Sequence, residues 1–376
     1  MYHSPAMNEN NCYDIAVVGA GPAGMVSATT CALAGASVIL LERDGWAGGK
    51  LGIQSHALQG PATIYSGQTG FEHQERLMNG ASDSGVKMRL GVEVSSLSLP
   101  GDEGEQFQLA VEGLLDSDGK VSSRAVILAT GSEEPEPDFP NSDLHGIMRS
   151  GVAQAALNVR GQSVGRRVVM VGSDNSGLLI AKNLLDSGAE VVAVLEEGTR
   201  IEGREFNAAP LREAGVEILT STRLVGVTGD GKLERVSVQS TESPDANVRE
   251  IEADTLCLAW PRAPESRLAR DAGLPALEIS ILGGKVPVHD RYFATLGAGL
   301  YVCGDASGVE SGATAMETGR LAGLAASAYL GYLHPDADAL AKLARGRLGY
   351  LRRGRRGRLR RDAKGALISH YRKLSS

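Results

Sequence analysis

The stretch "YDIAVVGAGPAGMVSATTCALAGASVILLERD", residues 13–44, decides the fold class of this 376-residue chain. An apolar run rich in β-branched residues is followed by a glycine-rich turn, a helical segment and a second apolar run that ends in an acidic residue. This order predicts a strand at 15–18, a helix over about 23–34 and a second strand at 37–41. The stretch therefore predicts a βαβ unit of a parallel, α/β fold.

The turn inside this stretch reads Gly19-x-Gly21-x-x-Gly24. In dinucleotide-binding units the first glycine permits a tight turn, the second lets the backbone approach a pyrophosphate, and the third lets helix pack on strand. The helix N-terminus supplies amide donors and partial positive charge for the phosphates. Glu42, at the end of the second strand, can accept hydrogen bonds from both ribose hydroxyls. The turn therefore predicts a dinucleotide site.

A second unit with the same order lies in "GRRVVMVGSDNSGLLIAKNLLDSGAEVVAVLEEG", residues 165–198. We expect its helix to begin near Ser176, between two apolar strands. Gly172, Asp174 and Gly177 stand at the three glycine places, and Glu196 ends the second strand. The chain thus contains two Rossmann-type units, one of which has a carboxylate where the middle glycine is expected.

Near the C-terminus, "LYVCGDASGVESGATAMETGRLAG" (300–323) predicts a strand, the pair Gly304-Asp305, and a helix from about residue 312. The pair places a carboxylate at the carboxyl edge of a parallel sheet, which is where ligands of open α/β sheets bind. Residues 107–131 and 232–260 instead predict antiparallel strands, the former turning at Asp118-Gly119.

The composition, with 42% hydrophobic and 22% charged residues, is that of a globular protein of two domains. No apolar run approaches the roughly 20 residues that span a bilayer, and the first residues lack the pattern of a signal peptide, so we expect a cytoplasmic protein. The four cysteines form no C-x-x-C pair. A redox dithiol and a cysteine-bound metal site are therefore excluded, and we expect no metal.

The charge is unevenly distributed along the chain. Residues 345–376 hold 12 lysines and arginines and one acidic residue, so the first 344 residues hold 26 basic and 44 acidic residues. Three interpretations of this basic tail stay open: a solvated extension, a docking segment for an acidic partner or for the chain's own acidic body, and a segment for nucleic acid or anionic membrane. The lack of interleaved aromatic residues argues against nucleic acid.

These pieces together resemble the FAD-dependent pyridine-nucleotide oxidoreductases with two dinucleotide-binding domains, in a layout similar to thioredoxin reductase. The resemblance runs from about Tyr13 to Leu330 and rests on "GAGPAG", "LLERD", "AGGKLG", "ILATG", the second nucleotide unit, "LYVCGDASG" and "TAMETGRLAG". Thioredoxin reductase has a C-x-x-C in its nicotinamide domain and this chain does not, so disulfide reduction is excluded.

Two further phrases, "LHGIMRSGVAQ" and "HDRYFAT", look like the FAD subunits of heteromeric amino-acid and opine dehydrogenases, sarcosine oxidase α and the hydrogen cyanide synthase group. Ferredoxin reductases of the thioredoxin-reductase type also lack the dithiol and remain a competing resemblance.

The resemblance implies two Rossmann-like three-layer domains, the second inserted into the first. The expected segments are 13–133 (first segment of the FAD-binding domain), 134–284 (NAD(P)-binding-like inserted domain), 285–331 (second segment of the FAD-binding domain) and 332–376 (basic C-terminal extension). The FAD-site residues that it implies are Gly19, Gly21, Pro22, Ala23, Gly24, Glu42, Arg43, Gly49, Lys50, Leu51, Val94, Thr130, Gly131, Gly304, Asp305, Ala313 and Thr314.

The second nucleotide site that the resemblance implies comprises Gly172, Asp174, Ser176 and Glu196. A side chain at 174 holds the backbone away from a pyrophosphate and adds like-charge repulsion, so we expect a weakened site for NAD(H). Glu196 would repel the 2′-phosphate of NADPH and so favours NADH, whereas the nearby Arg200 and Arg204 keep NADPH as an alternative. Hydride transfer requires no titratable base, and no catalytic acid or base is assigned. The histidines at 56, 73, 145 and 289 are expected to be surface or structural residues.

Three functions stay open. The first is a flavoprotein oxidoreductase whose FAD exchanges electrons with a small substrate or a partner subunit. The second is an NADH-dependent flavin reductase that passes electrons to ferredoxin or another protein acceptor. The third is a non-catalytic flavin-binding scaffold subunit. Each implies a homo- or hetero-oligomer or an electron-carrier partner, for which residues 345–373 are a candidate docking segment.

Overall fold

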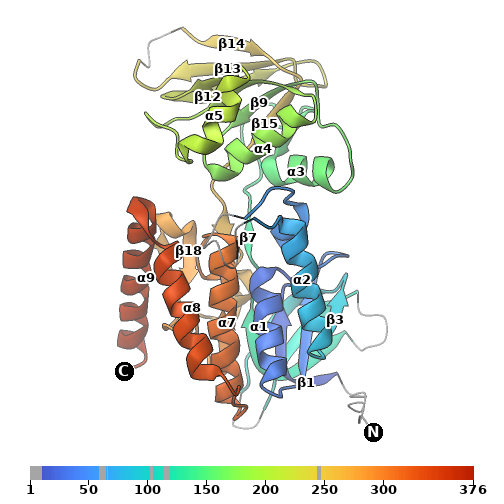
Figure 1. The fold of residues 1–376 in the computed structure, drawn as a ribbon, viewed down its shortest axis with the longest axis vertical. Coiled ribbons are helices and arrows are strands. Elements are labelled where there is room, and N and C mark those ends of the chain that lie inside the picture. The colour runs from blue at the N-terminus through green and yellow to red at the C-terminus, as the bar shows by residue number, and fades with distance from the viewer. Residues whose placement is uncertain (1–10, 59–64, 66, 102–104, 114–118, 244–246) are drawn as a thin grey trace. The chain divides into compact units, whose positions relative to one another are not determined.

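The computed structural model describes residues 11–58, 65, 67–101, 105–113, 119–243 and 247–376 (Figure 1). Internal contacts divide the chain into two compact units, one formed by Met1–Glu133 with Arg262–Ser376 and the other by Glu134–Pro261. The turn expected at Asp118 lies outside the described residues. Among the described residues no helix is long and apolar enough to cross a membrane.

The first unit is built on one twisted sheet in the order β3-β2-β1-β6-β5-β4, with β19 pairing the end of β6. Strands β1, β2, β3, β6 and β19 are parallel, whereas β4, β5 and the start of β6 form antiparallel pairs. The strands are β1 (Cys12–Val18), β2 (Val38–Glu42), β3 (Lys87–Leu90), β4 (Glu93–Ser98), β5 (Phe107–Glu112), β6 (Lys120–Leu128) and β19 (Leu300–Val302). The central strands β1 and β2 are almost wholly buried, as expected for the middle of a parallel sheet covered on both faces.

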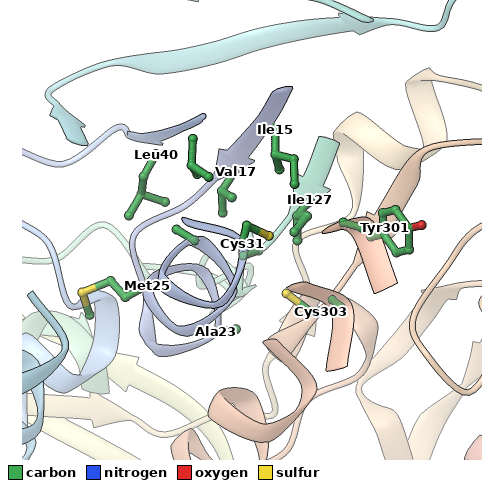
Figure 2. Close-up of a cluster of buried hydrophobic side chains, with 14 of the residues drawn as sticks. Ile15, Val17, Ala23, Met25, Cys31, Leu40, Ile127, Tyr301 and Cys303 are labelled. Atoms are coloured by element: carbon green, nitrogen blue, oxygen red, sulfur yellow. The ribbon is translucent and has the colours of Figure 1, made fainter. Parts of the chain in front are cut away.

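The helices of this unit are α1 (Pro22–Leu33), η1 (Gly49–Ile53), α2 (Gly70–Asp83), α6 (Arg267–Asp271), η2 (Ser280–Leu282), η3 (Gly304–Ser307), α7 (Gly312–Tyr329), α8 (Ala337–Leu351) and α9 (Gly354–Leu374). Figure 2 shows α1 packed on the sheet, with Cys31 beside Val17 and Ile127; Met25 belongs to the same buried cluster. Helices α1 and α7 approach closely, since a Cβ at Gly319 would lie 2.2 Å from the carbonyl oxygen of Ala23.

The second unit is a parallel five-stranded sheet in the order β11-β10-β9-β15-β8, with an antiparallel meander β12-β13-β14. Its strands are β8 (Ile147–Arg149), β9 (Arg167–Val171), β10 (Glu190–Leu195), β11 (Glu217–Leu219), β12 (Thr222–Thr228), β13 (Arg235–Ser240), β14 (Arg249–Glu252) and β15 (Thr255–Leu258). Its helices are α3 (Ser150–Asn158), α4 (Asn175–Asp186) and α5 (Glu205–Glu213). Both Rossmann-type units expected from the sequence are therefore present as β1-α1-β2 and β9-α4-β10.

The expected end of the inserted domain at residue 284 is wrong, because the second unit ends at Pro261. Residues 262–284 belong to the first unit, where β16 (Ala263–Pro264) pairs with β7 (Ser132–Glu133) and β17 (Ala276–Ile279) forms a hairpin with β18 (Gly284–Pro287). The pairing of β16 with β7 joins segments that are distant in sequence, so local patterns give no sign of it.

The basic tail also belongs to the first unit. Helix α8 lies beside α7, with Ala344 and Leu348 buried in the core that α1 and α7 share. Helix α9 packs on η2 and β18 through Leu367, which has no exposed surface. The tail is thus a folded part of the first unit, and in the view of Figure 1 its two helices follow α7 in orange and red.

Candidate functional site

The parallel strands of the first unit bring their carboxyl ends to one edge of the sheet. In the strand register Val18 lies opposite Leu41 and Leu128, and Leu128 lies opposite Val302. The residues that follow these positions are the glycine turn after β1, Glu42, the Thr130-Gly131 pair after β6, and the Gly304-Asp305 pair after β19. Four motifs that are separate in sequence therefore meet at the edge where open α/β sheets bind ligands.

The turn after β1 requires glycine at its first and third places. Gly19 has a φ of 100°, and a Cβ there would lie 2.5 Å from the carbonyl oxygen of Ala129. A Cβ at Gly24 would lie 1.8 Å from the carbonyl oxygen of Gly19. Both distances are too short for a real side chain, so these glycines are fixed by packing.

The middle glycine is free of such constraints, and it leaves the helix N-terminus open. A Cβ at Gly21 would meet nothing within 4 Å among the described residues. Gly21 is the N-cap of α1, no described side chain accepts a hydrogen bond from that first turn, and Pro22 stands at the first helical position. Beside it, a Cβ on Gly49 would lie 3.2 Å from the Cα of Gly21. The helix therefore presents unsatisfied amide donors to open space, as an anion site requires.

Glu42 is buried at the end of β2, beside this turn. Its carboxylate accepts hydrogen bonds from the amides of Ala20 at 2.7 Å and Asp44 at 2.9 Å. Burial raises the pKa of Glu42, although these two hydrogen bonds oppose the effect. The next residue, Arg43, is exposed and pairs with Glu133 at 3.4 Å. Val94 lies in β4 with its side chain in the core, so only its backbone is left to face a ligand.

Asp305 is the centre of a charged cluster at the same edge. Its carboxylate accepts a hydrogen bond from the Ser132 hydroxyl at 2.7 Å and lies 3.5 Å from Arg262 and 4.0 Å from Lys50. The amide of Glu310 donates to its other oxygen at 3.1 Å. Burial alone would raise the pKa of Asp305, but Arg262, Lys50 and the hydrogen bonds lower it, so the carboxylate is charged.

The cluster is tied to the strand end that carries Thr130 and Gly131. The Thr130 hydroxyl donates to the carbonyl oxygen of Glu265, whose amide donates to Gly131 at 3.0 Å. Sequence reasoning missed Ser132 and Arg262 as members of the site. Ser132 directly follows the "ILATG" motif and Arg262 lies in "AWPRAPES", but neither carries a pattern that indicates contact with Asp305.

Helix α7 begins at this edge and has a capped N-terminus. The Ser311 hydroxyl accepts a hydrogen bond from the amide of Thr314 at 3.2 Å, and Ala313 and Thr314 are buried. Leu51 of η1 is buried against the first turn, 3.5 Å from the position of a Cβ at Gly312. The partial positive charge of this 18-residue helix therefore points to the edge where Asp305 lies.

The turn after β9 in the second unit has the same backbone frame. Gly172 has a φ of 96°, and a Cβ there would lie 2.4 Å from the carbonyl oxygen of Ala259. A Cβ at Gly177 would lie 2.3 Å from the carbonyl oxygen of Gly172. Ser176 lies in the first turn of α4. The frame is therefore that of a dinucleotide turn despite the residue at 174.

The helix that follows the second turn has a side-chain cap, unlike α1. Asp174 is the N-cap of α4, and its Oδ1 accepts a hydrogen bond from the amide of Gly177 at 2.8 Å. Glu196 accepts hydrogen bonds from the Ser173 hydroxyl and from the amide of Gly198. A carboxylate thus satisfies the amide that a phosphate would use. Sequence reasoning assigned repulsion to Asp174 but missed its capping role, which the preference for Asp at N-caps signals.

Loop 202–204 lies over the second turn. The Gly203 amide donates to the carbonyl oxygen of Ser173 at 2.8 Å, and the Arg204 amide donates to the Asn175 side chain at 2.9 Å. A Cβ at Gly203 would lie 2.8 Å from the Ser173 carbonyl oxygen. These backbone groups of the loop and the turn are therefore hydrogen-bonded within the unit.

The two turns differ in what they can hold. The first has an uncapped helix N-terminus and a buried acidic residue at the next strand end, which fits the pyrophosphate and ribose of a dinucleotide. The second has the same frame, but its N-cap carboxylate, that of Asp174, accepts a hydrogen bond from the amide of Gly177. Within the described part of the chain no cluster of His, Cys, Asp and Glu fits a metal ion. The histidines at 73 and 289 are buried, as structural residues are expected to be.

Comparisons with known proteins agree with this fold. The family described as pyridine nucleotide-disulphide oxidoreductase matches residues 13–319. The A subunit of opine oxidase from Agrobacterium tumefaciens (strain Ach5) is 29% identical, over 87% of this chain and 68% of its own length. A ferredoxin–NADP reductase of Gluconobacter oxydans (strain 621H) is 27% identical, over 86% of this chain and 93% of its own.

The solved structure of thioredoxin reductase from T. acidophilum has the same fold, with a TM-score of 0.71 at 22% identity over 86% of this chain and 99% of that one. The chain spans about two thirds of the opine oxidase subunits that it matches and a third of a sarcosine oxidase α subunit.

Proposed function

Because the chain belongs to the pyridine nucleotide-disulphide oxidoreductase family, we propose that it is an FAD-dependent oxidoreductase subunit. In this proposal its flavin exchanges electrons with an amino-acid or opine substrate, or with a partner subunit that oxidises one. The second unit then serves as a structural domain whose nucleotide turn is closed. The chain carries no C-x-x-C pair, so disulfide reduction is not part of the proposal.

The observation that carries the proposal is the difference between the two helix N-termini. At α1 the N-cap is Gly21, which leaves amide donors for a pyrophosphate. At α4 the N-cap is Asp174, whose carboxylate already accepts the Gly177 amide. A dinucleotide phosphate at α4 would have to displace this carboxylate or approach it, and a like-charge contact at about 4 Å costs about 4 kcal/mol at an effective dielectric constant of about 20.

The residues of the first unit have distinct roles in this proposal. Bound FAD would supply an acceptor for a hydride from the substrate, from which electrons could pass on singly or in pairs. The amides that follow Pro22, which itself has no N–H, would bind its pyrophosphate, and Glu42 would bind the adenosine ribose. Asp305, kept charged by Arg262 and Lys50, would accept a hydrogen bond from a ribitol hydroxyl. The N-terminus of α7 stabilises negative charge placed against it.

The relatives support an assembly with other subunits. The opine oxidase and sarcosine oxidase matches are each named as one subunit of an enzyme. We therefore propose that this chain works with a partner subunit or an electron-carrier protein. The exposed arginines of α9 are its candidate docking residues, whereas Lys364 is buried and Arg352 is partly buried within the chain.

A second candidate function is an NADH-dependent reductase of a protein acceptor such as ferredoxin. Two observations favour it. The ferredoxin–NADP reductase match covers nearly the whole of that protein. A cavity of about 270 Å³ also lies at the carboxyl end of β9, lined by Val171, Glu197 and Trp260 among others, and could take one portion of a nucleotide.

The two functions are separated by the electron donor. The purified protein is loaded with FAD and mixed without oxygen with NADH, with NADPH, and with amino acids or opines in the presence of proteins that co-purify with it. The proposal expects the flavin absorbance to bleach only with the amine substrates and the partner. Bleaching by NADH within the time of one turnover, with reduction of added ferredoxin, would establish the second function instead.

A further inference from the structure

The C-terminal helices α8 and α9 lie outside the region of the chain that the family matches, which ends at residue 319. The arginines at 353, 355, 358 and 361 are exposed. Four other basic residues turn inward and are wholly or partly buried: Arg347, Arg352, Arg360 and Lys364. Burying a cation is costly unless it is paired, so these contacts require a reason.

Arg352 reaches the segment that holds Asp305. Its Nε donates to Glu310 at 2.9 Å and its terminal nitrogen donates to the other oxygen at 2.6 Å, which is a two-point pair with both side chains nearly buried. The amide of Glu310 in turn donates to the Asp305 carboxylate at 3.1 Å. Glu310 thus connects Arg352 of the tail to the Asp305 carboxylate.

Lys364 reaches the same segment from α9. Its ammonium donates to the carbonyl oxygen of Ser307, and the Ser307 hydroxyl donates to the carbonyl oxygen of Gly304 at 2.8 Å. The third neighbour is His289, whose Nδ1 donates to the Asp290 carbonyl at 2.7 Å, which leaves Nε2 as an acceptor 3.3 Å from Lys364. Lys364 is therefore satisfied by acceptors on two segments.

The two contacts lie on residues 305–311, a short segment in which regular secondary structure ends. Residues 305–311 run from within η3 to the residue before α7, and Gly308 among them has a φ of 121°. Such a loop orders poorly on its own, because each residue fixed in one conformation loses entropy. Lys364 donates to Ser307 and Arg352 to Glu310, so the tail contacts this segment on both sides of Gly308.

We propose that α8 and α9 belong to the cofactor site, with Arg352 and Lys364 as positioning residues that hold residues 305–311 in the shape that binds FAD. The inference rests on the proposed function only in assigning Asp305 to FAD. A clamp of this kind strengthens binding because the ordering cost is met during folding rather than on binding.

The test measures the FAD dissociation constant of the FAD-free protein and the hydrogen exchange of the amides at 305–312. The variants are Arg352→Met and Lys364→Met, and the matched control is Arg358→Met, which removes an exposed arginine of α9. We expect each inward variant to bind FAD at least about tenfold more weakly, equivalent to about 1.4 kcal/mol, and to exchange the 305–312 amides faster. The control should match the wild type in both measurements.

A variant that fails to fold has a substitute. Arg352→Met leaves Glu310 buried without its partner, so the double variant Glu310→Gln/Arg352→Met removes both charges and keeps the amide at 310. Its FAD affinity should fall as in the single variant. Unchanged affinity and unchanged exchange in the folded variants would overturn the clamp. A wild-type protein that binds no FAD would refute the proposed function, whereas the exchange measurement would still decide whether the tail orders this segment.

Discussion

Replacing Asp174 tests its capping of α4 and its proposed exclusion of a nucleotide phosphate. Asp174→Gly restores the usual middle glycine and removes the hydrogen bond to the Gly177 amide. Loss of an N-cap costs about 1 kcal/mol when alanine replaces it, but only a few tenths when glycine does. Asp174→Asn keeps an acceptor in the capping position and removes only the charge. Together with Asp174→Ala, these two variants separate the effects of capping, charge and side-chain volume.

The expected stabilities follow from the cap. In urea unfolding the free energy of unfolding should fall by about 1 kcal/mol for Asp174→Ala, and by a few tenths for Asp174→Gly and Asp174→Asn. The affinity for NADH should instead depend on how much space the side chain at 174 leaves in the turn. Removing a carboxylate about 4 Å from a phosphate removes up to about 4 kcal/mol of like-charge repulsion, and contacts of loop 202–204 with the turn reduce this gain. We therefore expect Asp174→Gly to bind NADH at least about tenfold more tightly than the wild type.

The assay is a titration of each FAD-loaded variant with NADH, followed by calorimetry. Asp174→Asn should gain less than Asp174→Gly, because its side chain still fills the turn. The reasoning would be refuted if Asp174→Gly bound NADH no better than the wild type. It would also be refuted if Asp174→Ala were as stable as the wild type, since Asp174 would then not be an effective cap.

Three other substitutions have outcomes that follow from the structure. Gly21→Ala should fold normally, because a Cβ there meets nothing within 4 Å among the described residues, but it should bind FAD at least about tenfold more weakly. Gly24→Ala should destabilise the fold itself, because its Cβ would lie 1.8 Å from the Gly19 carbonyl oxygen. Thermal unfolding measures the stability of each variant and flavin fluorescence its FAD binding. If the two variants were equally stable, the packing argument would be contradicted. Burial lowers the pKa of Lys364 to about 7 from 10.5, so between these values the unfolded chain binds more protons at this residue than the folded protein does. The contribution of Lys364 to the free energy of unfolding should therefore rise between about pH 7 and about pH 10, by at most about 1.4 kcal/mol per pH unit. Urea unfolding at about pH 7 and about pH 9 should show this rise in the wild type and not in Lys364→Met. A difference between variant and wild type that does not change with pH would contradict the lowered pKa of Lys364.

The sequence predicted those features of the site that depend on local pattern. The glycines at 19, 21 and 24 identify their turn because the strand before it and the helix after it are local features. The βαβ units and the exception at Asp174 were predicted for the same reason. The capping bond of Asp174 was also accessible, since it joins residues three apart.

The remaining features depend on contacts between distant segments. Ser132 and Arg262 meet Asp305 only because β6, β19 and the strand pair β7–β16 bring them to one edge. The pairing of β7 with β16 is also why the expected boundary at 284 was wrong. Charge counting showed that the tail is basic, but it could not show that Arg352 pairs with Glu310, because 42 residues separate them.

The central claim is that electrons reach the flavin by a route other than NADH bound in the second unit. Rapid mixing of the FAD-loaded wild-type protein with excess NADH, without oxygen, tests it most directly. The account predicts that the flavin absorbance stays oxidised for many seconds, while Asp174→Gly shows NADH binding. Full bleaching of the wild type within the dead time or the first second would contradict it.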